Sequence, residues 1–283
     1  MKIVSIALLI TTLAACHEQP KTLVKNAGAA TLEANNIPAA RYGVEGFYTG
    51  EFKAARPDDT QADNAYRRIV VRIDSLDGGR IYGHSIVVAH DRPFSGTYIK
   101  SGNAYQVTAQ EPGDDPTDGR FHFTLDPTTK TLAGDWQANK SDMAISARKY
   151  MLHQRTYRYD SQLALPESMP QTFLAEGNDD TDAVEILTSD VVKKNPSVAL
   201  LTSSDVENMY KGDLEVLRNS IYARHGYVFK NARMAQLFNN YVGWYLPVSP
   251  EVTGQLTEIE KKNITLIKRY ENHASRYYSS FGR

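Results

Sequence analysis

The chain has 283 residues and is almost balanced in charge, with 32 basic and 33 acidic side chains. This balance gives no support for a nucleic-acid partner or for a strongly basic surface that binds membranes. The sequence contains one cysteine, which excludes a disulfide within the chain. The folded parts must therefore be held together by the burial of apolar side chains.

The amino-terminal residues have the composition of a secretion signal. Lys2 precedes an apolar stretch over residues 3–13, which is too short to span a bilayer as a stable helix. Leu13-Ala14-Ala15-Cys16 follows, and it resembles the lipobox of bacterial lipoproteins. This resemblance implies that residues 1–15 are a signal peptide and that Cys16 is acylated, for example with palmitate, as the first mature residue. The alternative is an ordinary cleavable signal with a leftover thiol.

A lipid on Cys16 would place the protein in the bacterial cell envelope, with the membrane as its first partner. Residues 16–41, which are rich in Ala and Asn, are expected to form a tether. His17 follows the cysteine. In enterobacteria an Asp at that position favours the inner membrane, so its absence favours the outer membrane here. The sequence does not indicate whether the protein lies on the periplasmic or on the surface-exposed, extracellular face of that membrane.

Residues 42–160 show the alternation of apolar and polar side chains that is typical of β-strands with one buried face. Turn-forming residues separate the runs, and the spacing predicts about eight strands in an antiparallel meander. The first choice is a small up-and-down barrel, lipocalin-like in architecture only, with a sandwich as the alternative. The inward-facing runs are predicted to be Ile69-Val71-Ile73, Tyr105-Val107-Ala109, Phe121-Phe123-Leu125, Leu132-Gly134-Trp136 and Met143-Ile145-Ala147. Turns are predicted at 77–79, 91–93, 101–103, 118–119 and 126–127.

Two features of this β region could carry chemistry. The loop 111–119 is rich in acids and resembles a calcium loop. It fails the EF-hand register because Pro116 falls at its third position, so a solvated hairpin loop is the better interpretation. His84, His90 and His122 lie on or beside separate strands and are expected to be exposed or locally paired. The sequence therefore predicts neither a metal site nor a cofactor.

Residues 161–199 carry 7 acidic and 2 basic side chains and are expected to form an acidic linker. From residue 200 to 283 the apolar period changes to that of helices. We expect a short helix capped by Ser204 and Glu207, and a second helix after Asp213 that ends at Gly226. A third helix is expected from about Asn231. The last helix should begin with a capping box of Thr257 and Glu260.

The second helix and the segments after it resemble a known family. LRNSIYARHGYVF at 217–229 contains the five letters for which the YARHG domain is named. Trp244-Tyr245 and LTEIEKKNI at 256–264 match the same family in the expected order. The resemblance covers roughly residues 205–270. It implies an extracytoplasmic module to which no enzymatic activity is attributed.

The polar and aromatic residues of this motif allow two interpretations. On helical wheels, Arg218, His225 and Asn263 fall on apolar stripes, so their polar groups must find partners. In the first interpretation they form an internal network, with Arg218 and Asn263 bonded to carbonyls near Gly226 and Trp244. In the second they line a small recognition pocket for an anionic or sugar-like ligand. The residues concerned are Arg218, Asn219, Tyr222, Arg224, His225, Gly226, Trp244, Tyr245 and Asn263.

Signatures of catalysis are not found in the sequence, which lacks a nucleophile elbow, a zinc-protease motif and a phosphate loop. Glu258 and Glu260 fall off the apolar stripe, so the wheel does not pair either with His225. We therefore expect a non-enzymatic envelope lipoprotein that recognises an envelope polymer or a protein partner. The alternatives are a small-molecule carrier or sensor that uses the barrel interior, and, more distantly, a hydrolase that uses His225.

Overall fold

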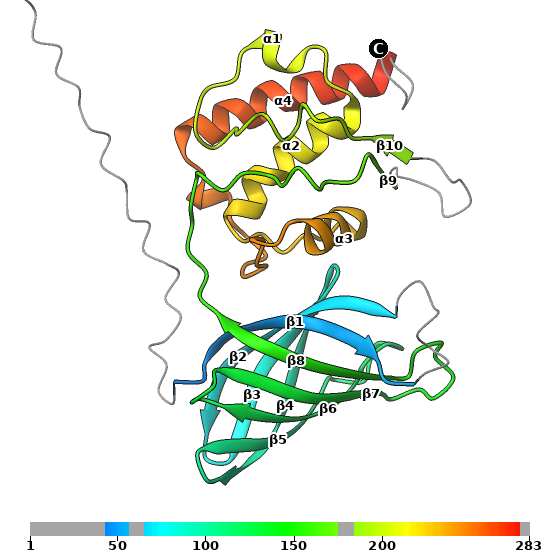
Figure 1. Ribbon diagram of the computed structural model, residues 1–283, viewed down its shortest axis with the longest axis vertical. Coiled ribbons are helices and arrows are strands. Elements are labelled where there is room, and N and C mark those ends of the chain that lie inside the picture. The colour runs from blue at the N-terminus through cyan, green and yellow to red at the C-terminus, as the bar shows by residue number, and fades with distance from the viewer. Residues whose placement is uncertain (1–42, 57–64, 175–183, 278–283) are drawn as a thin grey trace, which may run out of the picture. The chain divides into compact units, whose positions relative to one another are not determined.

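The computed structural model describes residues 43–56, 65–174 and 184–277. Cys16 and the expected tether lie outside these residues. The described chain forms an antiparallel β-barrel of eight strands, followed by a region with four α-helices (Figure 1). This confirms the predicted fold class, an all-β domain followed by a small helical domain.

Each barrel strand pairs antiparallel with its neighbours in the chain, and β1 also pairs with β8 to close the barrel. Phe47 lies opposite Arg155 at one end of this closing ladder, and Ala54 lies opposite Arg148 at the other. The strands are β1 (Gly46–Ala54), β2 (Tyr66–Asp77), β3 (Arg80–Val87), β4 (His90–Ser101), β5 (Ala104–Gln110), β6 (Gly119–Asp126), β7 (Thr131–Ala138) and β8 (Ala147–Arg155).

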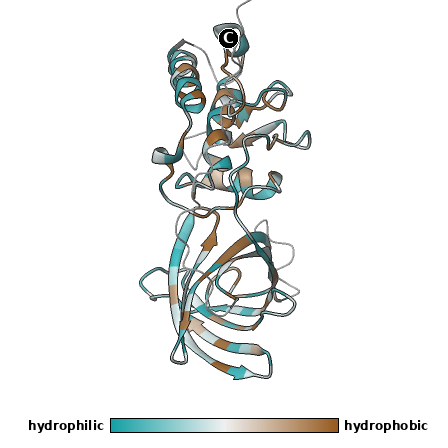
Figure 2. Ribbon diagram, turned by 90° about the vertical axis from the view of Figure 1, so that its left-hand side faces the viewer, coloured by the Kyte–Doolittle hydropathy of each residue, from teal (hydrophilic) through white to brown (hydrophobic). Residues whose placement is uncertain are grey.

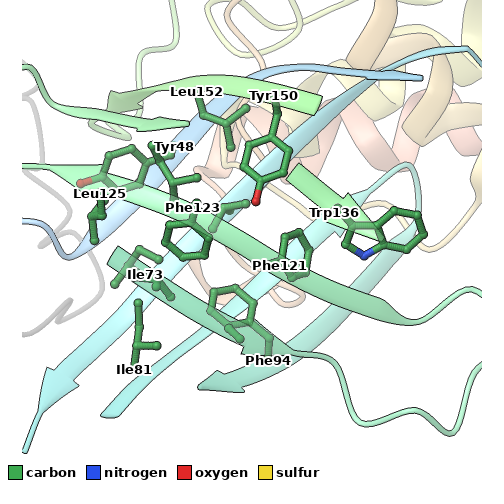
Figure 3. Close-up of a cluster of buried hydrophobic side chains, with 14 of the residues drawn as sticks. Tyr48, Ile73, Ile81, Phe94, Phe121, Phe123, Leu125, Trp136, Tyr150 and Leu152 are labelled. Atoms are coloured by element: carbon green, nitrogen blue, oxygen red, sulfur yellow. The ribbon is translucent and has the colours of Figure 1, made fainter. Parts of the chain in front are cut away.

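Side chains fill most of the barrel interior. Hydrophobic and hydrophilic residues alternate along the strands (Figure 2), which places one set inside and the other outside. Figure 3 shows aromatic and aliphatic side chains from several strands that meet on the axis. The buried cluster includes Tyr48, Ile69, Val71, Ile73, Ile81, Phe94, Phe121, Phe123, Leu125, Leu132, Trp136, Tyr150 and Leu152.

Two local predictions about the barrel were wrong. Residues 91–93 lie within β4, and the chain turns instead at Val88-Ala89, where Val88 adopts a left-handed φ of 55°. A turn at Val88 carries no sequence signal, because β-branched residues rarely adopt that conformation. Met143 and Ile145 do not continue a strand either. They belong to a loop before β8, whose inward residues are Arg148, Tyr150 and Leu152.

The expected acidic linker is part of the packed helical region. Strands β9 (Thr172–Leu174) and β10 (Val184–Ile186) form a two-stranded antiparallel sheet. Phe173, Leu187 and Val191 are buried together with residues of the helices. The apolar positions of this segment are sparse among acids, so its composition concealed that it contributes to the core.

The helical region contains α1 (Ser203–Val206), α2 (Lys211–Arg224), α3 (Ala232–Tyr241), the 3₁₀ helix η2 (Thr253–Gln255) and α4 (Glu258–Tyr277). Helices α2 and α4 lie side by side (Figure 1). Helix α3 starts next to Asn231, as predicted, and the Asn231 side chain caps it by accepting from the backbone N–H groups of residues 233 and 234. No helix in the described ranges has both the length and the apolar character needed to cross a membrane.

The starts of α1 and α2 differ from the prediction. Thr202, not Ser204, caps α1, and the Asp205 carboxylate accepts from the Thr202 backbone N–H at 2.7 Å. Helix α2 begins before Gly212. Asp213 therefore lies within its first turn, where it accepts the backbone N–H and the hydroxyl of Thr188 at 2.7 and 2.9 Å. Helix N-termini carry partial positive charge, which favours a carboxylate at both positions, although burial raises the pKa of Asp213.

Candidate functional site

The YARHG letters lie at the carboxyl end of α2, where Gly226 ends the helix. Gly226 has φ of 69°, and its backbone N–H donates to the Ala223 carbonyl at 3.0 Å. The Tyr227 N–H donates to the Tyr222 carbonyl at 3.1 Å, which completes a left-handed C-cap. A Cβ at residue 226 would lie 2.5 Å from Cγ2 of Val248. Both the conformation and the space thus require glycine.

His225 is fully buried and pairs with an acid on α4. Its Nε2 lies 2.8 Å from Oε2 of Glu260, and both side chains are 0% exposed. The Tyr159 ring stacks on the imidazole with centroids 4.3 Å apart. Nδ1 of His225 is buried and has no hydrogen-bond partner among the described residues. Because water and substrate cannot reach the ring, this geometry gives no support to a hydrolase that uses His225.

The predicted capping box explains why Glu260 faces His225. The Thr257 backbone N–H donates to Oε2 of Glu260 at 2.9 Å, and the Glu260 N–H donates to Oγ1 of Thr257 at 3.3 Å. The carboxylate therefore turns back over the end of α4 instead of pointing outward. Tyr159 adds a hydroxyl donor to Oε1 at 3.1 Å. Burial raises the pKa of Glu260, but the hydrogen bonds and charge of His225 and the backbone bond to Thr257 lower it to a greater extent.

Arg224 is also turned inward and is 1% exposed. Its Nε donates to the Leu163 carbonyl and its NH1 to Oγ of Ser220, both at 2.8 Å. The guanidinium lies 5.6 Å from the ring centre of Trp244, whose indole N–H donates to the Ala164 carbonyl at 2.7 Å. Arg224 and Trp244 therefore hold the segment that follows the barrel against α2.

The remaining motif residues bond to other parts of the helical region. Nε of Arg218 donates to Glu271 on α4 at 2.8 Å, not to the carbonyls near Gly226 and Trp244 that the sequence suggested. Asn263 is buried, and its amide donates to the carbonyls of Pro196 and Ala199 at 2.7 and 2.8 Å. Its oxygen accepts from the Leu201 N–H at 2.9 Å.

Three further residues complete the set. Asn219 is buried beside Arg218, whose NH1 donates to its oxygen at 3.5 Å. The Tyr245 hydroxyl donates to the Tyr227 carbonyl at 2.7 Å, and Tyr222 packs against the cluster of Ile221, Leu256 and Ile264. The structure thus distributes the predicted residues over several internal contacts and does not gather them around a pocket.

A cavity of about 310 Å³ lies elsewhere, at one end of the barrel. It lies where β1, β3, β5 and β7 end and β2, β4, β6 and β8 begin. The loop before β8 contributes Met143, Ala144 and Ile145 to its wall. We call this cavity the barrel mouth. Its lining residues are Phe52, Arg67, Ile69, Val87, Val88, His90, Arg92, Glu111, Thr117, Phe121, Trp136, Met143, Ala144, Ile145 and Arg148.

Aromatic rings form one side of the barrel mouth and separate it from the filled part of the barrel. Phe52 meets Trp136 edge to face, with ring centroids 5.7 Å apart. Phe121 packs against Tyr150 at 6.2 Å and against Phe94 at 5.6 Å, and Figure 3 shows these rings side by side. The rings hold one another in place, so this wall of the cavity is formed before any ligand enters.

Glu111 is the acid that lines the barrel mouth, and it is buried, at 4% exposure. Its Oε1 accepts from Ser85 Oγ at 2.5 Å, and its Oε2 accepts from the Gly119 N–H at 2.7 Å and Trp136 Nε1 at 3.3 Å. Burial raises the pKa of Glu111, although these hydrogen bonds act in the opposite direction. The interpretation of 111–119 as a solvated loop was therefore wrong for Glu111.

The arginines of the barrel mouth also contact the protein itself. Nε of Arg92 lies 3.1 Å from Oδ1 of Asp118, which is buried in the same loop, and NH2 of Arg92 lies 3.2 Å from Asp115. NH1 of Arg148 donates to the Phe52 carbonyl at 2.9 Å, and the guanidinium lies over the Phe52 ring. This site was not predicted from the sequence. The available signal was Arg148. It follows the same alternation as Tyr150 and Leu152 and therefore lies on the inward face of β8.

Of the three histidines considered in the sequence, His84 lies 2.8 Å from Asp91 and His122 lies 3.7 Å from Asp135. His90 is exposed and lines the barrel mouth. No group of three or more metal-binding side chains occurs in the part of the chain that the structure describes.

Comparison with known proteins identifies one part of the chain. The family model of the YARHG domain matches residues 192–272, so this segment is a YARHG domain. The match begins within the segment expected to be a linker and covers α1 to most of α4. No curated protein and no solved structure gives a significant match to the chain.

Proposed function

We propose that this chain is a non-enzymatic lipoprotein of the bacterial envelope that acts as a small-molecule carrier or sensor. Its ligand would bind in the barrel mouth. The cavity of about 310 Å³ at one end of an otherwise filled barrel is the observation that supports this proposal. Ligand pockets in proteins usually have volumes of roughly 300–1,000 Å³ and apolar walls with a few polar groups.

Recognition of an envelope polymer or a protein through the YARHG motif has less support. Arg224, His225 and Asn263 are buried and bonded within the helical region, and Trp244 uses its indole N–H on a backbone carbonyl. In this proposal the YARHG domain is a folded support whose motif letters fix its internal structure. Membrane attachment through Cys16 and location at the outer membrane remain part of the proposal, and they are supported by the sequence of residues 13–17.

Binding in the barrel mouth can be tested with the full chain reconstituted in phospholipid nanodiscs. Isothermal titration would use two probes of the same shape, naphthalene-2-carboxamide and naphthalene-2-carboxylate, with empty nanodiscs as the control for partitioning. We expect saturable binding of at least one probe. Ala144→Phe, at an exposed position of the cavity wall, should weaken binding at least tenfold.

Ser141→Phe is the matched control, because Ser141 lies exposed in the same loop and does not line the cavity. It should bind like the unmodified chain. If neither probe binds, or if the two variants lose binding equally, the barrel mouth is not a ligand site.

A further inference from the structure

We infer that the ligand of the barrel mouth is a small, uncharged molecule with a flat apolar body, such as one or two fused rings. This inference rests on the proposed function and adds the chemical class of the ligand. Three properties of the barrel mouth lead to it: the composition of the wall, the state of its polar groups, and its size.

The wall is predominantly apolar, and its central part is aromatic. Nine of its 15 lining residues have apolar side chains: Phe52, Ile69, Val87, Val88, Phe121, Trp136, Met143, Ala144 and Ile145. Rings prefer to meet other rings edge to face or in offset stacks, which adds about 0.5–1.5 kcal/mol to the burial of their area. Phe52, Phe121 and Trp136 are fixed by contacts with one another or with Tyr150. A flat apolar molecule would therefore find a preformed surface.

Three of the four charged side chains of the wall are bonded to more distant parts of the protein, and the fourth, Arg67, donates to the neighbouring Tyr66 carbonyl at 3.5 Å. Glu111 accepts three hydrogen bonds, and Arg92 lies between the carboxylates of Asp115 and Asp118. Arg148 donates to a backbone carbonyl and contacts the Phe52 ring. An ionic ligand would have to compete with these bonds. When a buried polar group loses its hydrogen-bond partner, the free-energy cost is about 1–3 kcal/mol, and it is larger when the group is charged.

The environment of Glu111 indicates how the barrel mouth would affect the stability of a bound ligand carboxylate. Burial raises the pKa of Glu111 even though three donors surround this carboxyl group. A ligand carboxylate placed nearby would lose its hydration in the same way, and it would also be repelled by any charge on Glu111. An uncharged ligand avoids both costs.

The size of the barrel mouth limits the ligand further. Its volume of about 310 Å³ lies at the lower limit of ligand pockets. The filled part of the barrel, with Ile73, Ile81, Leu125 and Leu152, leaves no continuation along the axis for a long acyl chain. A compact ring system fits these dimensions better than a lipid tail.

The two naphthalene probes test this inference separately from the proposed function, because they share one shape and differ in charge at neutral pH. We expect the carboxamide to bind at least tenfold more tightly than the carboxylate, with both affinities reduced by Ala144→Phe and retained in Ser141→Phe. Equal binding, or tighter binding of the carboxylate, would overturn the uncharged class and leave the proposed function intact. Binding of neither probe would overturn both.

Discussion

The buried pair of His225 and Glu260 should be the strongest polar link between α2 and α4. Glu260→Ala removes a carboxylate that makes four hydrogen-bond contacts, with His225 Nε2, with the Thr257 N–H and hydroxyl, and with the Tyr159 hydroxyl. Its removal leaves buried donors without an acceptor, which costs about 1–3 kcal/mol for a neutral group and more for a charged one. We expect a loss of that size in the free energy of unfolding.

The measurement is urea unfolding of the full chain, followed by circular dichroism at the helix band. Glu258→Ala is the control, since Glu258 is an exposed acid in the first turn of the same helix and forms an ion pair with Lys261 on the surface. It should change the midpoint little. The double variant His225→Ala/Glu260→Ala should cost clearly less than the sum of the two single variants, because the contact is lost only once.

The pH dependence of this stabilisation follows from the lowered pKa of Glu260. A carboxyl group with a lowered folded-state pKa stabilises the fold fully above its ordinary value of 4.5. The stabilisation is lost as the pH falls below 4.5 and through the folded-state pKa. The difference in stability between the unmodified chain and Glu260→Ala should therefore shrink in acid. Equal midpoints for the Glu258 and Glu260 variants at pH 7 would refute the role assigned to the pair.

Three further predictions concern the helical domain and the membrane anchor. Gly226→Ala should lower stability by at least about 1–2 kcal/mol in thermal or urea unfolding, the cost of a left-handed residue with a Cβ, whereas Gly243→Ala, with open space around its Cα, should not. Asn263→Leu should expose the amides around Leu201 to faster hydrogen exchange, because it removes three bonds to that segment. Unchanged exchange would contradict this role. Cys16→Ala should abolish metabolic fatty-acid labelling and detergent partition, and retained labelling would exclude acylation at this residue.

The barrel could be predicted because its strands alternate strictly, so that Ile69-Val71-Ile73 and Phe121-Phe123-Leu125 identify the inward face. The turn at Val88 could not be predicted, because its left-handed backbone depends on the surrounding ladder and not on local propensity. The packing of Phe173 and Leu187 was hidden by acidic neighbours, which dominate the composition of their segment.

The partner of His225 was missed for a geometric reason. A helical wheel assumes that side chains point outward from the axis, and on this basis Glu260 fell away from the apolar stripe. An acid at the third position of a capping box instead folds back over the helix end. The two predictions, the capping box and the wheel, were in conflict, and the capping box describes the structure.

The closing ladder between β1 and β8 determines where the rest of the chain joins the barrel. The polypeptide enters at Gly46 and departs at Arg155, and these residues belong to the rim opposite Phe52 and Arg148, which border the barrel mouth. The connections to both flanking segments therefore lie on the rim away from the barrel mouth. If Cys16 carries the proposed lipid, the length of the segment before Gly46 sets the reach of the barrel from the membrane, and a change in that length should leave binding in the barrel mouth unchanged.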